Sequence, residues 1–526
     1  MKNLRKSYIY GLMLLSSLGI GSCTSGFDNQ DPSGVTTEEA GRDGYRLKKS
    51  FQEAGEYIVP INANTNQFTD CLLGGSFGGY LADSNAGFNG KNYATYNPEE
   101  HWIQVMFNDI ITNIYKSRKT IRELTDDPQP LAASNIMYIM AAQRVTDTYG
   151  PIPYSKIGQD GSLIAPYDSQ EEVYNAMFNE LEEAIETLTS LETADFSELV
   201  DDVYGGKVVQ WIKLANSVKL RMAMRISDAN PTLAKQKAEE AVNHKVGVMT
   251  AASDNAYKPV YKENPFWVVT EKYNNGDSHM SADLASYMNG YNDPRREKYF
   301  KQADFSDPTM PKGYQGIRSG ILIPNSDYIK QFSKMNILLL DKVLWMNASE
   351  VAFLRAEGAL KGWNMQGTAE DFYNEGIKLS FEQWGATDVD AYTADATSTP
   401  LRYSDPLKGK GLGDNSYKGS PSTITIKWDN SATEDQKLER IITQKWIANF
   451  PLGLEAWSDF RRTGYPKLME VVVNNSGGKV DSKRMARRLP YPQAEYSENG
   501  ANVQAAIQML GGPDNMGTDV WWAKKK

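Results

Sequence analysis

Apolar positions recur at steps of three and four residues through long parts of the chain, a spacing that predicts amphipathic helices. The signal is clearest at residues 169–191, where Ser169 and Glu172 have capping-box spacing and an apolar stripe runs from Val173 to Leu191. Paired helices of this length suggest a tetratricopeptide-like solenoid, although the sequence has no clean 34-residue period. Further helices are predicted over residues 99–125, 132–149, 206–228, 232–244, 346–362, 369–384, 434–450, 453–462 and 500–510.

Two long segments interrupt the helical pattern. Residues 245–342 are rich in Asn, Asp, Gly, Pro and Tyr and have only short apolar runs, which predicts loops, short strands and one short helix over residues 280–289. Residues 386–432 are rich in Gly, Ser, Asp and Tyr and form a second irregular insertion. The predicted fold class is therefore mostly α, with helix pairs that carry irregular loop and short-strand insertions.

The first 22 residues have the features of a secretory signal. The start is basic, residues 9–20 are apolar but too few to span a bilayer as a helix, and small residues precede Cys23. The ending Ile-Gly-Ser-Cys resembles the bacterial lipobox, in which cleavage occurs before a cysteine that carries lipid. We therefore predict a lipoprotein signal peptide over residues 1–22, a lipidated Cys23 with a flexible tether over residues 23–37, and a single body over residues 38–526.

Charge and cysteine content narrow the function classes. Without the signal, 53 basic residues stand against 66 acidic ones, a net charge of −13. Such a chain repels nucleic acid, so we predict no nucleic-acid partner. If lipid occupies Cys23, then Cys71 is alone and no intrachain disulfide can form. The three histidines have no Cys/His or H-E-x-x-H spacing, so we predict no metal and no cofactor.

Three later segments match the signature segments of a known family. They are LWMNASEVAFLRAEG at residues 344–358, GLEAWSDFRRTGYP at residues 453–466, and RLPYP at residues 488–492, which Glu495 follows. With these segments and the lipobox-like end of its predicted signal peptide, the chain resembles the SusD/RagB family of outer-membrane lipoproteins. The resemblance implies a right-handed superhelical scaffold of tetratricopeptide-like helix pairs, with irregular insertions that carry the ligand site.

The resemblance also implies a location and partners. We expect a lipid-anchored protein exposed at the surface of the cell outer membrane, where it covers a SusC-like TonB-dependent transporter as a lid. Its expected ligand is an oligosaccharide or polysaccharide, which it captures and delivers without catalysis. A peptide ligand, as in the RagB-like branch, stays open, because an acidic chain disfavours acidic ligands without separating neutral glycan from peptide.

A sugar ring has apolar C–H faces and a rim of hydroxyl groups, so a sugar site needs aromatic rings beside amides or carboxylates. The chain has 29 Tyr, 17 Phe and 11 Trp, and residues 80–102 and 257–293 place such rings beside Asn and Asp. Trp267 and Tyr273, next to the turn formed by residues 274–277, are the strongest candidates. The full predicted ligand-binding set is Asp83, Asn85, Tyr93, Tyr96, Trp267, Tyr273, Asn275 and Tyr291.

Other motifs favour structure over catalysis. Residues 74–78 match the G-x-S-x-G pattern of serine hydrolases, but a polar loop follows where the pattern needs a helix. Glu455, Asp459 and the pair Arg461-Arg462 have helical spacing, which predicts structural ion pairs. A surface glycoside hydrolase with two catalytic carboxylates is the remaining enzymatic alternative, because 66 acidic residues make such a pair easy to imagine and impossible to locate.

Overall fold

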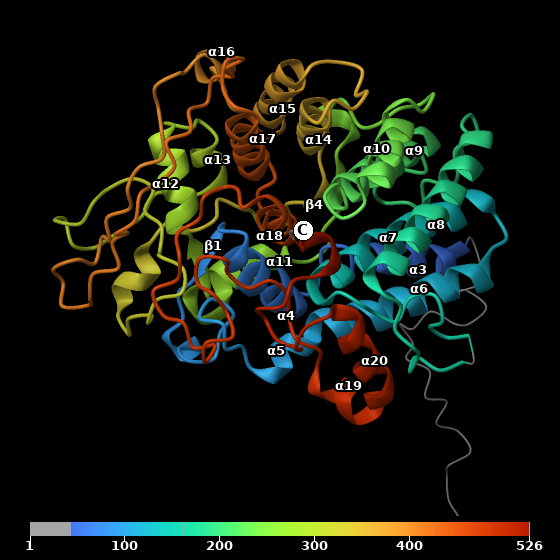
Figure 1. The fold of residues 1–526 in the computed structure, drawn as a ribbon, viewed down its shortest axis with the longest axis horizontal. Helices are drawn as coiled ribbons and strands as arrows, with labels where there is room; N and C mark the ends of the chain where they lie inside the picture. The colour runs from blue at the N-terminus through green and yellow to red at the C-terminus, as the bar shows by residue number, and fades with distance from the viewer. Residues whose placement is uncertain (1–43, 160, 525–526) are drawn as a thin grey trace, which may run out of the picture. The chain divides into compact units, whose positions relative to one another are not determined.

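The computed structural model describes residues 44–159 and 161–524 (Figure 1). The predicted signal peptide, Cys23 and the tether to residue 37 lie outside the described residues. From Leu47 onward the chain forms one compact unit. Its α-helices are α3 (Tyr45–Gly55), α4 (Ala63–Asn66), α5 (Glu100–Gln104), α6 (Ile110–Leu124), α7 (Pro128–Tyr149), α8 (Gln170–Ser190), α9 (Val208–Arg225), α10 (Pro231–Val242), α11 (Pro265–Trp267), α12 (Ala282–Gly290), α13 (Arg296–Tyr299), α14 (Ala348–Leu360), α15 (Ala369–Trp384), α16 (Val389–Thr393), α17 (Glu434–Ala448), α18 (Gly453–Thr463), α19 (Gln493–Glu498) and α20 (Gly500–Leu510).

The helices stack in sequence order, which confirms the predicted scaffold of helix pairs. α6 packs on α7, α7 on α8, α8 on α9 and α9 on α10, and these helices lie together at the right of Figure 1. A second group, α14, α15 and α17, lies at the top of the same view, with α14 also against α9. Ser169 caps α8 by accepting a hydrogen bond from the Glu172 N–H, while the Glu172 carboxylate accepts one from the Ser169 N–H.

The helix predicted over residues 99–125 is interrupted. α5 continues into a π-helical segment, η4 (Val105–Asp109), before α6 begins. Another π-helical segment, η2 (Gln67–Gly75), lies in a region where the pattern predicted no helix. Eight of its nine residues are buried, so it has no polar face and no amphipathic period to detect.

The G-x-S-x-G match is a packing motif. A Cβ atom at Gly453, the first residue of α18, would lie 2.3 Å from the backbone carbon of Gly74, and one at Gly78 would lie 2.5 Å from the Gly453 oxygen. Glycine at these positions lets the backbones of η2 and α18 touch. Ser76 is buried and donates its hydroxyl hydrogen bond to Asp83.

Two short antiparallel sheets organise the irregular segments. β1 (Leu81–Asp83) pairs with β3 (Ser278–Met280), with Asp83 opposite Ser278. β2 (Ala256–Lys258) pairs with β4 (Val343–Met346). The first sheet joins the two segments, residues 80–102 and 257–293, in which the sequence predicts the ligand-binding residues.

Candidate ligand-binding site

Asp277 is the centre of a polar cluster at the end of the β1–β3 pair. Its carboxylate accepts hydrogen bonds from the amide groups of Gln67 at 2.6 Å, Asn85 at 2.9 Å and Asn274 at 2.9 and 3.1 Å. Burial raises the pKa of Asp277, and the Asn274 and Asn85 amides partly offset that rise. The carboxylate therefore ties three separate chain segments into one surface.

The turn that precedes Asp277 has an unusual backbone. Asn274 and Asn275 have φ values of 50° and 58°, in the left-handed region that Asn tolerates better than most residues. The Gly276 carbonyl accepts hydrogen bonds from the Ser84 hydroxyl at 2.7 Å and from the Lys330 ammonium at 2.6 Å. These contacts fix the turn, and the side chains of Asn274 and Asn275 are exposed.

Trp267 and Tyr273 are the partly exposed rings next to this cluster. Asn264 caps α11 by accepting hydrogen bonds from the N–H groups of Phe266 and Trp267. Trp267 is half-buried, and the Lys272 ammonium lies 5.2 Å from its ring centroid. Tyr273 is also half-buried and opens the short 3-10 turn over residues 273–275. Both rings can present a face to a ligand while they remain anchored.

Asp83 lies behind the cluster rather than on its surface. Its carboxyl group is 4% exposed, Oδ1 accepts from the Ser76 hydroxyl at 3.3 Å, and Oδ2 has no hydrogen-bond partner. Burial raises the pKa of Asp83 to about 7, and the nearby charge of Asp277 adds to the rise. Asp83 therefore changes protonation near neutral pH at a position that supports the site.

Three of the predicted rings belong to the core instead. Tyr93 is fully buried and donates to the Trp102 carbonyl at 2.6 Å, while Tyr291 is 2% exposed and donates to the Ile424 carbonyl at 3.0 Å. Tyr96 is 3% exposed and packs against Phe77. The prediction that these rings receive a ligand does not fit their burial, because none offers a face to solvent. Tyrosine in a polar segment is consistent with loop anchoring as well as with ligand binding, and the sequence alone did not separate the two.

The sequence analysis missed Gln67, Lys330 and Lys334. Gln67 and Lys330 hold the turn, and Lys334 lies 3.5 Å from Asn275 Oδ1 and 3.2 Å from the Glu271 carboxylate. No local signal marks these residues, because Gln67 is 210 positions from the aspartate it contacts and the two lysines are 54 and 59 positions from their partners in the turn.

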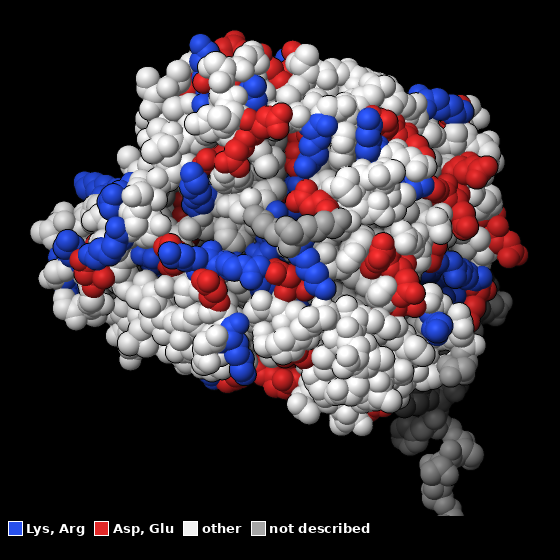
Figure 2. Space-filling view, viewed as in Figure 1, with Lys and Arg blue, Asp and Glu red and all other residues white. Residues whose placement is uncertain are grey.

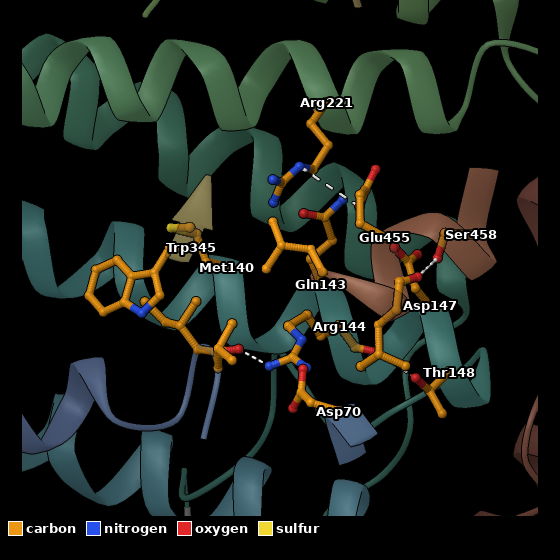
Figure 3. A pocket seen from close by; sticks show the side chains of 14 residues that line it. Asp70, Met140, Gln143, Arg144, Asp147, Thr148, Arg221, Trp345, Glu455 and Ser458 are labelled. Atoms are coloured by element: carbon orange, nitrogen blue, oxygen red, sulfur yellow. Dashed lines mark hydrogen bonds and ion pairs between the residues drawn. The ribbon is translucent and has the colours of Figure 1, made fainter. Parts of the chain in front are cut away.

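A second set of charged side chains is enclosed in the scaffold (Figure 3). It surrounds a cavity of about 30 Å³, the space of a water molecule or two, in which Arg221 of α9 and Glu455 of α18 point toward each other. Arg221 makes two hydrogen bonds to Glu350 of α14, at 2.7 and 2.6 Å. Lys445 of α17 lies 2.7 Å from Asp459 and 3.2 Å from Glu455. Of the ion pairs predicted within α18, the described residues show Arg462 with Asp459, at 3.6 Å. Glu455 and Asp459 pair instead with cations of other helices, and Arg461 donates to backbone carbonyls.

The signature segments supply much of this buried network. Glu350 and Glu357 come from the first segment, Glu455, Asp459 and Arg462 from the second. In the third segment, Arg488 donates from Nε to the Tyr149 carbonyl at 2.9 Å. Five of these six residues are less than 5% exposed. The sixth, Glu455, accepts a hydrogen bond from Arg225. The charged residues of these segments therefore join helices in the interior of the scaffold.

The described residues contain no group of three or more His, Cys, Asp or Glu side chains placed to hold a metal ion. In the same part of the chain, no helix combines the length and the apolar character needed to cross a membrane. Figure 2 shows basic and acidic side chains interspersed on one face, with a row of Lys and Arg across its left half. No single sign of charge covers that face.

A family model described as SusD-like, "Susd and RagB outer membrane lipoprotein", matches residues 28–523. The chain belongs to the SusD-like family. A SusD homologue from Bacteroides uniformis is 49% identical, with a TM-score of 0.88 over 92% of this chain and all of the other. One from Bacteroides ovatus is 42% identical, with a TM-score of 0.87 over 92% of this chain and all of the other.

A third structure similar to this SusD-like chain is described as a chitin-binding SusD homologue from Flavobacterium johnsoniae. It is 39% identical, with a TM-score of 0.83 over 91% of this chain and 99% of the other. Among curated proteins, no sequence matches this chain.

Proposed function

We propose that this SusD-like protein binds oligosaccharide or polysaccharide at the cell surface and delivers it to a SusC-like TonB-dependent transporter, without catalysis. The observation that carries the proposal is membership of the SusD-like family together with a 39% identical homologue described as chitin-binding. The lipobox-like ending at Cys23 supports attachment to the outer membrane by lipid.

The ligand surface in this proposal is the exposed part of the β1–β3 cluster. Trp267 and Tyr273 supply apolar ring faces for the C–H faces of a sugar, and Asn85 and Asn275 supply amide groups for its hydroxyls. Asp277 holds these elements in fixed positions through its three amide partners. A site of this kind loses little conformational entropy when the ligand binds.

Affinity gel electrophoresis of the mature protein tests the proposal. We expect at least one member of a panel of soluble polysaccharides that includes glycol chitin to retard the protein. Trp267→Ala is expected to weaken that retardation at least about fivefold, because a ring stacked on a sugar contributes roughly 1 kcal/mol or more. Trp363→Ala is the matched control, since Trp363 is also half-buried but lies between α14 and α15.

The outcomes separate the parts of the proposal. If no polysaccharide retards the protein, glycan binding is wrong, and retardation by a peptide conjugate would point to the peptide alternative. If Trp267→Ala and Trp363→Ala both behave as wild type on a bound polysaccharide, the site is misplaced. Release of new reducing ends by the purified protein would contradict the non-catalytic role.

A further inference from the structure

A separate cavity lies between the β2–β4 pair and the C-terminal end of α15. Its volume is about 390 Å³, within the range of small-molecule sites, and it shares no residue with the β1–β3 cluster. Its lining is unusually aromatic, with five rings contributed by Tyr257, Phe266, Tyr299, Trp384 and Phe450. Aliphatic side chains fill the spaces between them.

Three of these rings, those of Tyr299, Trp384 and Phe450, pack against one another. Tyr299 stacks on Phe450 with ring centroids 4.7 Å apart, and its edge meets Trp384 at 4.5 Å. The Tyr299 hydroxyl donates to the Ile447 carbonyl at 3.0 Å. These contacts within the protein hold the apolar wall in place.

Two polar groups in the lining residues lack partners. The indole N–H of Trp384 and the side-chain oxygen of Gln383 are buried, and no described residue hydrogen-bonds to either. Buried polar atoms in folded proteins are normally paired, so both are available to a bound molecule after a small rotation.

The charged groups that line the cavity are two lysines and one carboxylate. Lys342 lines it, is exposed, and has no carboxylate within 4.0 Å among the described residues. Lys298 also lines it, and its single ion pair is a 3.6 Å contact with Glu297, its neighbour in the chain. The carboxylate is that of Asp341, whose Oδ2 accepts a hydrogen bond from the Leu338 N–H at 2.7 Å, so the lining carries one more positive than negative group. In a chain of net negative charge, two such lysines favour an anionic ligand.

Three exposed leucines lie in the chain between the lining residues Ile337 and Asp341. Leu338, Leu339 and Leu340 are 68%, 40% and 58% exposed. Asn264 holds their loop in place, since its N–H donates to the Leu339 carbonyl at 2.7 Å and its side chain donates to the Asp341 carbonyl at 2.8 Å. Consecutive exposed leucines beside an apolar cavity are typical of a binding surface.

We propose that this cavity binds a small aromatic carboxylate, with the ring against the aromatic lining and the carboxylate at Lys342 and Lys298. The rings supply the apolar contact, and Lys342, which has no ion pair among the described residues, selects the charge. The site is independent of the proposed glycan surface, so one can fail while the other stands.

Isothermal titration of the mature protein with 3-phenylpropionate tests this site, with 3-phenylpropanol as the uncharged probe of the same shape. We expect saturable binding of the acid and at least about tenfold weaker binding of the alcohol, since a hydrogen bond to a charged group contributes about 1.5 kcal/mol or more. Lys342→Gln should weaken acid binding by a similar factor and leave alcohol binding unchanged. Lys378→Gln is the control, because Lys378 is exposed on α15 outside the cavity lining.

A second variant fills the cavity. Ile337→Trp places a large ring at a half-buried lining position and should abolish binding of both probes, while an unchanged unfolding midpoint verifies the fold. The proposal is overturned if wild type shows no saturable binding of the acid up to about 10 mM, a range that covers weak millimolar ligands. It is also overturned if Lys342→Gln and Ile337→Trp bind the acid as wild type does.

Discussion

Arg462 donates two hydrogen bonds to Glu357, from Nη1 to Oε1 at 2.5 Å and from Nη2 to Oε2 at 2.7 Å, and both residues are buried. Burial by itself would raise the pKa of Glu357, but the Arg462 guanidinium outweighs it and the pKa lies below its usual value. The pair joins α18 to α14, which carry two of the signature segments. The residues that mark the family in the sequence thus join its helices.

Removing one charge of this pair should destabilise the folded protein. Glu357→Gln leaves the Arg462 guanidinium buried with Asp459, at 3.6 Å, as its nearest remaining carboxylate. We expect the free energy of unfolding to fall by about 3–5 kcal/mol, the usual cost of breaking a buried ion pair, as measured by urea denaturation. Glu123→Gln, which breaks the exposed 2.6 Å pair with Lys119, should change it by about 0.5 kcal/mol or less. Similar losses in the two variants would contradict the assignment.

The buried carboxyl of Asp83 predicts a pH dependence of stability. Its pKa is raised to about 7 in the fold from an ordinary value near 4, so the folded state binds the proton more tightly. Stability from this group is therefore fully present below about pH 4 and is lost as the pH rises toward 7. Asp83→Asn mimics the protonated form and should remove this loss.

The comparison needs two pH values. We expect Asp83→Asn to raise the free energy of unfolding by about 2–4 kcal/mol at pH 8 and by clearly less at pH 5, measured in urea. Asp307→Asn is the control and should lower the free energy of unfolding instead of raising it. Hydrogen bonds from Lys410 and Thr309 lower the pKa of Asp307 to about 2, so its ionised form stabilises the fold. An Asp83→Asn effect that is the same at both pH values would show that Asp83 is already ionised in the fold.

Helix positions were the most predictable part of the fold, and side-chain exposure in the insertions was the least. The stripe from Val173 to Leu191 predicted α8, because a helix that is buried on one side has apolar residues at every third or fourth position. Fully buried η2 has no such contrast and went undetected. The pairing of β1 with β3 was not predicted either, because it depends on contacts across almost 200 residues.

The dependence on contacts between distant residues also limited the prediction of the candidate site. Composition pointed to two segments as ligand-binding, and the structure brings these segments into contact, with Asn85 Nδ2 and Asp277 Oδ1 2.9 Å apart. Composition did not show which rings face inward, so Tyr93, Tyr96 and Tyr291 were predicted together with Trp267 and Tyr273. Exposure of a ring depends on the packing of distant helices, which no local window of sequence contains.

Tyr93→Phe tests the assignment of that ring to the core. The change removes only the hydroxyl that donates to the Trp102 carbonyl at 2.6 Å, and leaves that buried carbonyl without this donor. We expect a loss of about 1–2 kcal/mol in the free energy of unfolding and no change in polysaccharide retardation. Trp267→Ala should show the reverse pattern, with little effect on stability and weaker retardation. Weaker retardation of folded Tyr93→Phe would place that ring in the ligand surface after all.

Asp277 should affect both stability and ligand binding. Asp277→Ala removes the acceptor of three amide donors, from Gln67, Asn85 and Asn274, so the turn loses its fixed position. We expect the free energy of unfolding to fall by about 1–3 kcal/mol, and the polysaccharide that retards wild type to retard the variant at least about fivefold less.

Asp201 provides the matched control for this variant. Its buried carboxylate accepts four hydrogen bonds, from the Trp211 indole at 2.7 Å and from the N–H groups of Val203 at 2.8 Å, Tyr204 at 3.3 Å and Gly206 at 2.9 Å, but it supports the helical scaffold. Asp201→Ala should cost a similar free energy of unfolding and leave retardation unchanged, in urea denaturation and affinity gels run side by side. If both variants lose retardation equally, the effect of Asp277 is general destabilisation, and the turn is not part of the ligand surface.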